Sequence, residues 1–265
     1  MPSDRPRGRG FIPFVTAGDP DPATSLAVLL KLEELGSDVI ELGVPFSDPV
    51  ADGPTIQRSS QRALNGGMTL RKTLKLAGEF RRHSDTPIVL FSYFNPIHRF
   101  GVTDFLMALA DAGIDGVLLT DVIDEEAINF SRECAENNIS LIPLIAPTTS
   151  DERLERICEN ASGFVYAIAR AGVTGSETIG NSESKRLVQR ARQFTDLPIA
   201  VGFGISSRTQ IEAVWEYADA AVVGSAIVAE IEKAIPTGDV VAAVEIFIKG
   251  LLPASENQRV FKNQE

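Results

Sequence analysis

Short apolar runs recur along almost the whole chain, separated by longer stretches in which polar and apolar residues mix. Each run holds five to seven residues and is rich in Val, Ile, Leu, Ala or Phe. Apolar runs of this length are typical of β-strands that are covered on both faces. We therefore expect eight strands, at residues 11–17, 39–43, 87–93, 116–121, 141–146, 164–169, 198–204 and 220–226.

The stretches between the runs have helical periodicity and helical end signals. After the first run, Asp21 can cap a helix whose first position is Pro22, and Gly36 is placed to end it. An apolar face at three-residue spacing lies between them: Leu26, Leu29, Leu32 and Leu35. After the seventh run, Ser207 and Gln210 are spaced as a capping box. The apolar face of the helix that follows is Ile211, Val214 and Trp215.

Eight strands that alternate with helices indicate a parallel sheet, and eight such units in about 250 residues fit a single (β/α)8 TIM barrel of the α/β class. An open, doubly wound sheet is the alternative, but the G-x-G-x-x-G motif expected after its first strand is absent. The longest strand-to-helix connections follow the second and sixth strands, at about 44–53 and 170–181. In a barrel both would lie on the carboxyl-terminal face, where active sites of this fold are found.

No linker-like segment divides the chain, so we expect one catalytic domain over residues 11–253. Residues 1–10 are interpreted as a basic N-terminal extension and residues 254–265 as a polar C-terminal tail. The N-terminus does not lead into the apolar core of a signal peptide. No apolar run approaches the roughly 18 residues that are needed to span a membrane.

Composition narrows the classes of partner. The chain has 265 residues, of which 44% are hydrophobic, and a net charge of −11, which argues against non-specific binding to nucleic acid or to anionic membranes. It does not argue against a small phosphate ligand. Cys134 and Cys158 are expected to be reduced thiols, so we expect a soluble, cytoplasmic protein. His83 and His98 are the only histidines, which excludes a His-rich metal site; no metal and no cofactor are expected.

A single carboxylate, Glu41, interrupts the second apolar run. On a strand, Val39, Glu41 and Gly43 share one face. If that face is the barrel interior, burial raises the pKa of the Glu41 carboxyl, which suits a general acid or base near neutral pH. The alternative is a structural ion pair, although the eight expected strands contain no Lys or Arg.

Other polar side chains near the strand ends are open to two interpretations. Asp19, Asp48 and Asp52 lie among Pro and Gly, where Asp commonly bonds backbone amides in turns, so each could be structural. Tyr166, in the middle of the sixth run, could present its hydroxyl to a pocket or belong to the plain apolar core.

Glycines at the ends of the last two runs suggest a phosphate site. Gly202 and Gly204 end the seventh run, and Gly224 and Ser225 lie near the end of the eighth, just before a helix. Glycines let backbone amides approach an anion, and the loops after strands 7 and 8 hold phosphate recurrently in this fold. The alternative is that these glycines only make tight turns. The loop after the sixth run would add Thr174 and Gly175.

Five segments together resemble a known family: FIPFVTAGDP, ELGVPFSDPVADGPTIQ, ARAGVTG, VGFGIS and GSAIV. In this order and spacing they are similar to the α subunit of tryptophan synthase, and the similarity runs from about Phe11 to the last helix. The resemblance implies a (β/α)8 barrel that cleaves indole-3-glycerol phosphate to indole and glyceraldehyde 3-phosphate in tryptophan biosynthesis.

The resemblance also implies roles for single residues. Glu41 and Asp52 match the family's two catalytic carboxyls, and Tyr166 matches a tyrosine close to both. Phe14 and Phe203 match positions that line the indole and glycerol pocket. The matches to the phosphate site are Gly175, Gly204, Gly224 and Ser225, with Thr174 nearby.

A partner is implied as well. The stretch Pro45–Asp48 resembles the part of the family that touches the β subunit, so an αββα assembly is expected, and residues 170–175 resemble a loop that closes over substrate. Phe46 would be exposed and covered by the partner, or would pack on its own barrel. The family usually begins with a helix under the barrel floor, which residues 1–10 do not predict. Two other functions stay open: a catalytically weak activator of a β subunit, and a stand-alone lyase.

Overall fold

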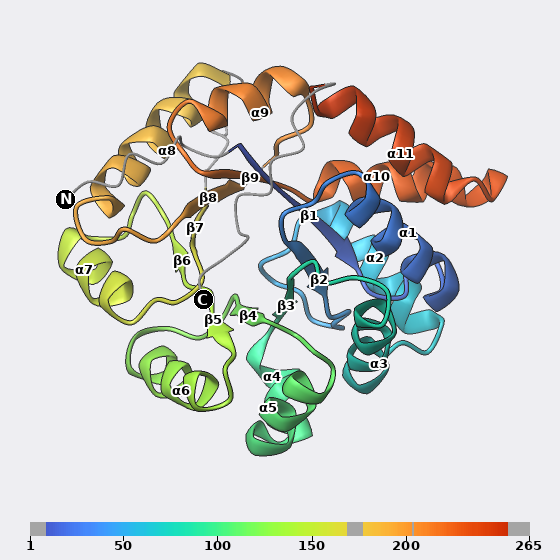
Figure 1. The fold of residues 1–265 in the computed structure, drawn as a ribbon, viewed down its shortest axis with the longest axis horizontal. Helices are drawn as coiled ribbons and strands as arrows, with labels where there is room; N and C mark the ends of the chain where they lie inside the picture. Colours follow the sequence, from blue (N-terminus) through green and yellow to red (C-terminus); the bar gives the residue numbers. More distant parts are fainter. Residues whose placement is uncertain (1–8, 169–176, 203, 254–265) are drawn as a thin grey trace.

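A computed structural model describes residues 9–168, 177–202 and 204–253 of the chain. Within these ranges the strands form one parallel, curled sheet that is surrounded by helices (Figure 1). The strands are β1 (Gly10–Thr16), β2 (Ile40–Gly43), β3 (Ile88–Ser92), β4 (Gly116–Leu119), β5 (Ser140–Leu141), β6 (Leu144–Ile145), β7 (Val165–Ile168), β8 (Ile199–Gly202) and β9 (Ala220–Val223). Their order in the sheet is β5-β4-β3-β2-β1-β9-β8-β7-β6.

The two edges of this order, β5 and β6, are consecutive pieces of one strand that is interrupted at Pro143. The Ile142 N–H donates to the Val117 carbonyl over 2.8 Å, and the Tyr166 N–H donates to the Pro143 carbonyl over 2.9 Å. The interrupted strand therefore bonds β4 on one side and β7 on the other, and the sheet closes. Pro143 has no N–H to give, which explains the break in a strand expected over 141–146. The (β/α)8 barrel predicted from the sequence is confirmed.

Helices follow the strands around the barrel (Figure 1). They are α1 (Pro22–Glu34), α2 (Pro54–Asn65), α3 (Leu70–Arg81), α4 (Phe94–Phe100), α5 (Val102–Asp111), α6 (Asp124–Glu136), α7 (Asp151–Glu159), α8 (Glu177–Ala191), α9 (Arg208–Trp215), α10 (Ser225–Ala234) and α11 (Val240–Leu251), with a 3-10 turn η1 (Ile235–Thr237) between the last two.

The helix caps predicted from the sequence are present. The Asp21 carboxylate accepts from the N–H groups of Ala23 and Thr24, each at 2.9 Å, and thereby satisfies two donors at the start of α1. Ser207 and Gln210 form the expected capping box at the start of α9.

Apolar side chains fill both sides of the strands. The barrel interior is packed by Ile12, Val39, Val89, Leu118, Ile142, Phe164, Ala200, Ala220 and Val222. A larger core lies between the strands and the helices, and it includes the leucines at 29 and 32 of α1. Burial on both faces is the reason that the strands read as continuous apolar runs.

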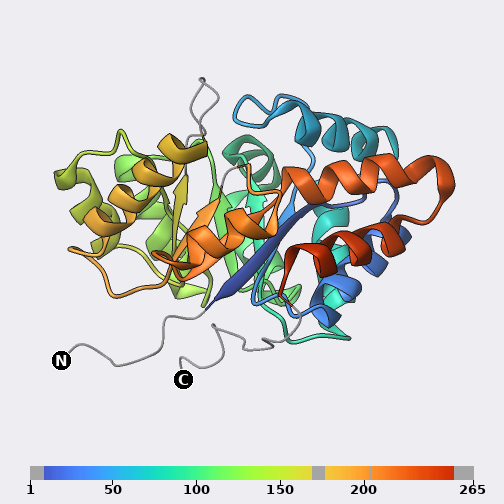
Figure 2. The same ribbon diagram turned by 90° about the horizontal axis from the view of Figure 1, so that it is seen from above.

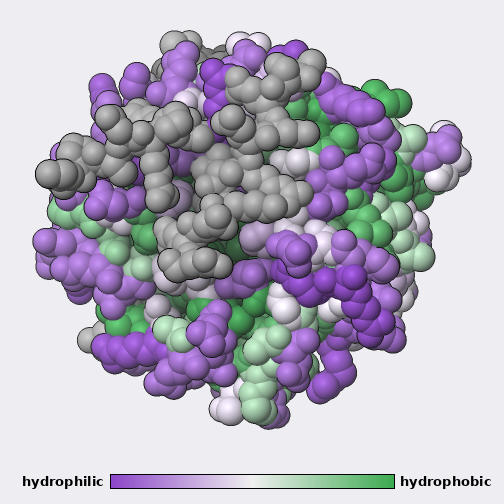
Figure 3. Space-filling view, in the orientation of Figure 1, coloured by the Kyte–Doolittle hydropathy of each residue, from purple (hydrophilic) through white to green (hydrophobic). Residues whose placement is uncertain are grey.

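The outer surface is mostly hydrophilic on the face seen in Figure 1, and apolar side chains gather at its right-hand edge, over α11 (Figure 3). Ile246 of α11 is 72% exposed. No helix in the described ranges is long and apolar enough to cross a membrane. Cys134 and Cys158 are buried free thiols. The predicted extension and tail fall almost wholly on residues 1–8 and 254–265, outside the described residues.

Aspartate side chains accept a backbone N–H from the first or second residue of three strands at the amino-terminal end of the barrel. The N–H of Phe11 donates to Asp38 over 2.8 Å, that of Ile88 donates to Asp115 over 2.8 Å, and that of Ile199 donates to Asp219 over 2.7 Å. Each aspartate lies just before the next strand, so it joins neighbouring strands at their start. Buried backbone donors need such acceptors, because a donor without one costs about 1–3 kcal/mol.

We predict that Asp38→Ala lowers the free energy of unfolding by about 1–3 kcal/mol, because the buried Phe11 N–H loses its acceptor. Asp85→Ala, at an exposed loop position, is the control and should change it by less than about 0.5 kcal/mol. Urea denaturation of the two variants measures the difference. Equal stability of both would mean that the Asp38 bond adds nothing.

Candidate active site

A cavity of about 360 Å³ opens at the carboxyl-terminal end of the barrel. Its wall combines residues of β1, β2, β3, β7 and β9 with the segment 51–56 after β2 and the starts of the loops after β8 and β9. Figure 2 shows this end at its upper edge, where β1 points and where the connection before α2 lies. The cavity is thus placed where barrel active sites are found.

Glu41 lies on the inner wall of the cavity. It stands beside Phe14 of β1 and Val89 of β3 in the sheet register, and it is 1% exposed. Its Oε1 atom has no hydrogen-bond partner among the described residues, and no ion pair of Glu41 is found in that part of the chain. Burial raises the pKa of the carboxyl to about 8. The structural ion pair considered from the sequence is therefore not found, and the group is a neutral acid at pH 7.

Tyr166 of β7 lines the same cavity. Burial, and then the neighbouring Glu41 carboxyl, raise the pKa of its hydroxyl well above the usual value, so it stays protonated. Its ring fits because Gly202 of β8 has no side chain: a Cβ there would lie 2.2 Å from the Tyr166 hydroxyl. Gly202, grouped with the phosphate glycines in the sequence, thus makes room for the tyrosine.

Asp52 lines the same cavity from the connection after β2, two residues before α2 begins. It is half-buried, and burial raises its pKa to about 6, while a hydrogen bond with the Tyr93 hydroxyl works in the opposite direction. The Tyr93 hydroxyl also accepts the Ala51 N–H over 2.9 Å. At pH 7 the Asp52 carboxyl is therefore mostly charged, whereas Glu41 is mostly neutral.

Tyr93 is a site residue that the sequence analysis missed. Burial, then the nearby Asp52 charge, raise the pKa of its hydroxyl to about 12. Its place directly after β3 could have pointed to it, because side chains at the carboxyl ends of barrel strands face the mouth. The other two candidate aspartates lie outside the cavity wall: Asp48 accepts the Ser47 hydroxyl over 2.5 Å, and Asp19 pairs with Arg62.

Another part of the cavity wall is made of small residues and the start of a helix. Gly224 and Ser225 lie at the N-terminus of α10, and Gly204 follows β8; all three line the cavity. Gly204 has a left-handed φ of +68°, and a Cβ there would meet nothing within 4 Å, so its backbone borders open space. Free N–H groups and the dipole at a helix N-terminus favour an anion. Thr174, Gly175 and Phe203 lie outside the described residues.

Phenylalanines complete the apolar part of the wall. Phe14 and Phe91 meet edge to face with ring centroids 5.3 Å apart. Gly43 makes this arrangement possible, because a Cβ there would lie 2.6 Å from the Phe14 ring. The cavity can therefore take a flat apolar group between an acid, a carboxylate and an anion-binding helix end.

Phe46 packs on its own barrel. Its ring centroid is 5.1 Å from that of Tyr93, and the side chain is half-buried, which favours the second interpretation of this residue. Val50 on the same connection is instead 89% exposed, and Ile123, after β4, is 56% exposed.

Comparison with known proteins gives one consistent result. The family model "Tryptophan synthase alpha chain" matches residues 3–252. The tryptophan synthase alpha chain of Caulobacter vibrioides (strain NA1000 / CB15N) is 48% identical over 93% of this chain and 88% of its own length, and that of Dechloromonas aromatica (strain RCB) is 50% identical over 85% and 84%. A structure from Pyrococcus furiosus, of the tryptophan synthase a2b2 complex, has a TM-score of 0.86 at 40% identity, with 92% of this chain and 98% of that chain covered.

The three comparisons agree on one family. The family model matches nearly the whole length, the relatives are close to half identical, and the solved structures have the same barrel. The chain therefore belongs to the tryptophan synthase alpha chain family.

Proposed function

We propose that this chain cleaves indole-3-glycerol phosphate to indole and glyceraldehyde 3-phosphate, with Glu41 as the proton carrier and Asp52 as the charge stabiliser. The observation that carries the proposal is the buried Glu41 carboxyl, whose Oε1 has no partner among the described residues and whose side chain lines the cavity. A neutral acid held ready in a pocket is what protonation of a carbon atom requires.

The proposed reaction begins with proton transfer from Glu41 to C3 of the indole ring. This leaves a positive charge at the ring nitrogen and turns the ring into an electron sink. The Glu41 carboxylate then removes the proton of the glycerol hydroxyl next to the ring. The carbon–carbon bond breaks, its electrons neutralise the ring, and glyceraldehyde 3-phosphate leaves as the aldehyde. Glu41 ends protonated, ready for another cycle.

Asp52 acts in this scheme on the charge that develops at the ring nitrogen. Because it stays ionised near neutral pH, it can accept the hydrogen bond of the ring N–H and stabilise the cation. Tyr93 orients the carboxylate through their hydrogen bond, and Tyr166 is the third catalytic residue, beside Glu41. The proposed phosphate ligands are Gly204, Gly224 and Ser225, together with Thr174 and Gly175 from outside the described residues. Phe14 and Phe203, the latter also outside them, are proposed to bind the rest of the substrate.

A β subunit is the proposed partner, in an αββα assembly, since the similar Pyrococcus furiosus structure is of an a2b2 complex. The exposed apolar Val50 and Ile123, on connections that follow β2 and β4, support contact at the barrel mouth. We propose the cytoplasm as the site of the reaction, which the two buried free thiols support. The cavity with its two carboxyls argues against a catalytically weak barrel, and a stand-alone lyase remains the second candidate.

Glu41→Gln should lower turnover by about 10²–10⁴-fold, because the proton carrier is lost. The variant should also be more stable than the parent at high pH, because it has no buried carboxyl to ionise. The native pKa of Glu41 is raised from 4.5 to about 8, so its contribution to stability is present below pH 4.5 and is lost as pH rises towards 8. The free energy of unfolding of the Gln variant should therefore exceed that of the parent by roughly 4 kcal/mol at pH 8 and equal it at pH 4. Near-parental turnover would contradict the assignment.

The pH dependence of kcat/KM should be bell-shaped. Activity should fall below about pH 6, where Asp52 gains a proton, and above about pH 8, where Glu41 loses its proton.

Asp52→Asn should remove the fall in activity at acid pH. It should also lower kcat by about 10²–10³-fold, with less change in KM, because the charge that Asp52 meets exists mainly in the transition state. Initial rates from pH 5 to 9 measure both. An acid limb retained in Asp52→Asn would assign it to another group.

Val50→Asp should weaken binding of a purified β subunit by about tenfold or more, which is about 1.4 kcal/mol. Ile246→Asp is the matched control, since Ile246 is also highly exposed but lies on α11. Calorimetric titration of the β subunit into each variant, with glycerol phosphate present, gives the dissociation constants. Equal loss in both variants would point to general damage, and no binding by the parent chain would favour the stand-alone lyase.

A further inference from the structure

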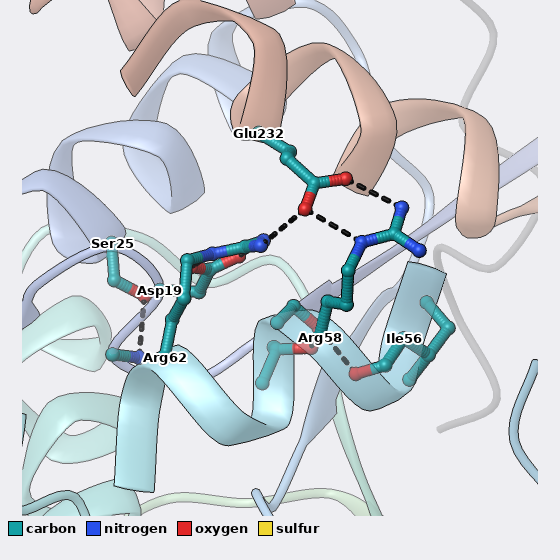
Figure 4. A network of polar contacts seen from close by, with 9 residues as sticks. Asp19, Ser25, Ile56, Arg58, Arg62 and Glu232 are labelled. Atoms are coloured by element: carbon teal, nitrogen blue, oxygen red, sulfur yellow. Dashed lines mark hydrogen bonds and ion pairs between the residues drawn. The ribbon is translucent and has the colours of Figure 1, made fainter. Parts of the chain in front are cut away.

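Four charged side chains of alternating sign form a chain of ion pairs beside the site (Figure 4). Asp19 accepts two bonds from Arg62, from Nε over 2.8 Å and from Nη2 over 2.9 Å. The Arg62 Nη1 then donates to Glu232 over 2.6 Å. Arg58 donates to both oxygens of Glu232, over 2.8 and 2.7 Å. Two of the three links are therefore bidentate, the strongest geometry for such pairs.

The inner part of this network is shielded from water. The Asp19 side chain is 1% exposed, while those of Arg62 and Glu232 are 25% and 28% exposed. Partly buried charges that are paired on several sides are screened less than surface pairs. Breaking such a set leaves charges without partners, so its geometry is held more firmly than that of an isolated surface bridge.

The network connects the two halves of the candidate site. Arg58 and Arg62 lie on α2, which begins at Pro54, just after Asp52. Glu232 lies on α10, whose first residue is Ser225. Figure 2 shows α2 beside α10, and the two helices pack together.

Helix α2 depends on this contact for its position. It precedes α3 in the connection between β2 and β3, and it packs against α10 and β1. A second tie joins it to β1, where the hydroxyls of Thr16 and Ser59 lie 2.6 Å apart. Among the described residues Asp52 itself has one side-chain partner, the Tyr93 hydroxyl. Its backbone carbonyl accepts from Nε2 of Gln57, a residue of α2, over 2.9 Å. The placement of the Asp52 backbone therefore follows the placement of α2, while Tyr93 orients the carboxylate.

We propose that Arg62 and Glu232 are positioning residues that hold Asp52 at the correct distance from Glu41 and from the phosphate end of the cavity. The proposal rests on the function proposed above. A charge stabiliser must meet the ring nitrogen within a fraction of an ångström, and a misplacement of about 1 Å can cost 10²-fold in rate. The ion pairs would thus act on kcat through Asp52, while the α10 N-terminus still binds phosphate.

Three variants separate positioning from plain stabilisation. Glu232→Ala breaks the network, and Arg62→Lys keeps the charge but loses the bidentate bond to Asp19. Glu245→Gln is the matched control: Glu245 also accepts from two basic side chains, Lys249 and Lys31, and its side chain is 29% exposed, but it lies on α11.

We expect Glu232→Ala to lower kcat for indole-3-glycerol phosphate by about 10- to 100-fold, with the dissociation constant of glycerol phosphate within about threefold of the parent's. The kcat of Arg62→Lys should lie between those of Glu232→Ala and the parent. The kcat of Glu245→Gln should equal that of the parent. If Glu232→Ala does not fold, Arg62→Lys carries the test.

The deciding measurement is a double-mutant cycle. If Glu232 acts through Asp52, Glu232→Ala should lower kcat by less than about twofold in the Asp52→Asn background. An undiminished, additive effect would overturn the positioning role, as would equal kcat in Glu232→Ala, Arg62→Lys and the parent. Cleavage by the parent and by Glu245→Gln shows that the proposed function itself stands, so the two failures are told apart.

Discussion

The burial of one carboxyl group, Glu41, is the constraint around which the site is organised. A carboxylate in an apolar interior loses hydration, and no described residue replaces it at Oε1 of Glu41, so the proton stays bound and the pKa rises to about 8. The surrounding barrel must be rigid enough to keep water and cations away from it. Closure of the sheet through the interrupted strand at Pro143 supplies that rigidity, because it leaves the strands no free edge.

The two ends of the barrel differ in how their buried polar groups are hydrogen-bonded. At the amino-terminal end, buried donors are matched with acceptors: Asp38, Asp115 and Asp219 take strand N–H groups, and the Trp215 indole N–H donates to the Gly10 carbonyl over 2.8 Å. At the carboxyl-terminal end, an oxygen of Glu41 remains unsatisfied among the described residues. The hydrogen bonds at the amino-terminal end offset the cost of the unsatisfied oxygen at the other end, as expected for a fold whose sites lie on one face.

Two carboxyls with separated pKa values result from different surroundings of the same chemical group. Glu41 is enclosed by strands, whereas Asp52 is half-buried on a connection and has a tyrosine hydroxyl beside it. One can hold a proton while the other holds a charge, which is how two carboxyls share acid–base chemistry at one pH. The ion pairs that join α2 to α10 are the proposed means by which Asp52, a residue on a long connection, is held in place.

Local patterns determined much of this protein. Apolar runs indicated the strands, the Asp21 and Ser207 caps indicated two helix starts, and the lone carboxylate at Glu41 stood out because its neighbours are apolar. These features depend on residues close in sequence, where period and burial leave a direct trace.

Tertiary structure decided the features that join distant residues. Tyr93 reaches Asp52, Gly202 makes room for Tyr166, and Arg62 pairs with Glu232, a residue 170 positions away. Phe46 packs on Tyr93, a choice between packing and exposure that its sequence position left open. None of these pairs has a signal of its own in the sequence, because each forms only when closure of the barrel brings the strand ends to one mouth and α2 against α10.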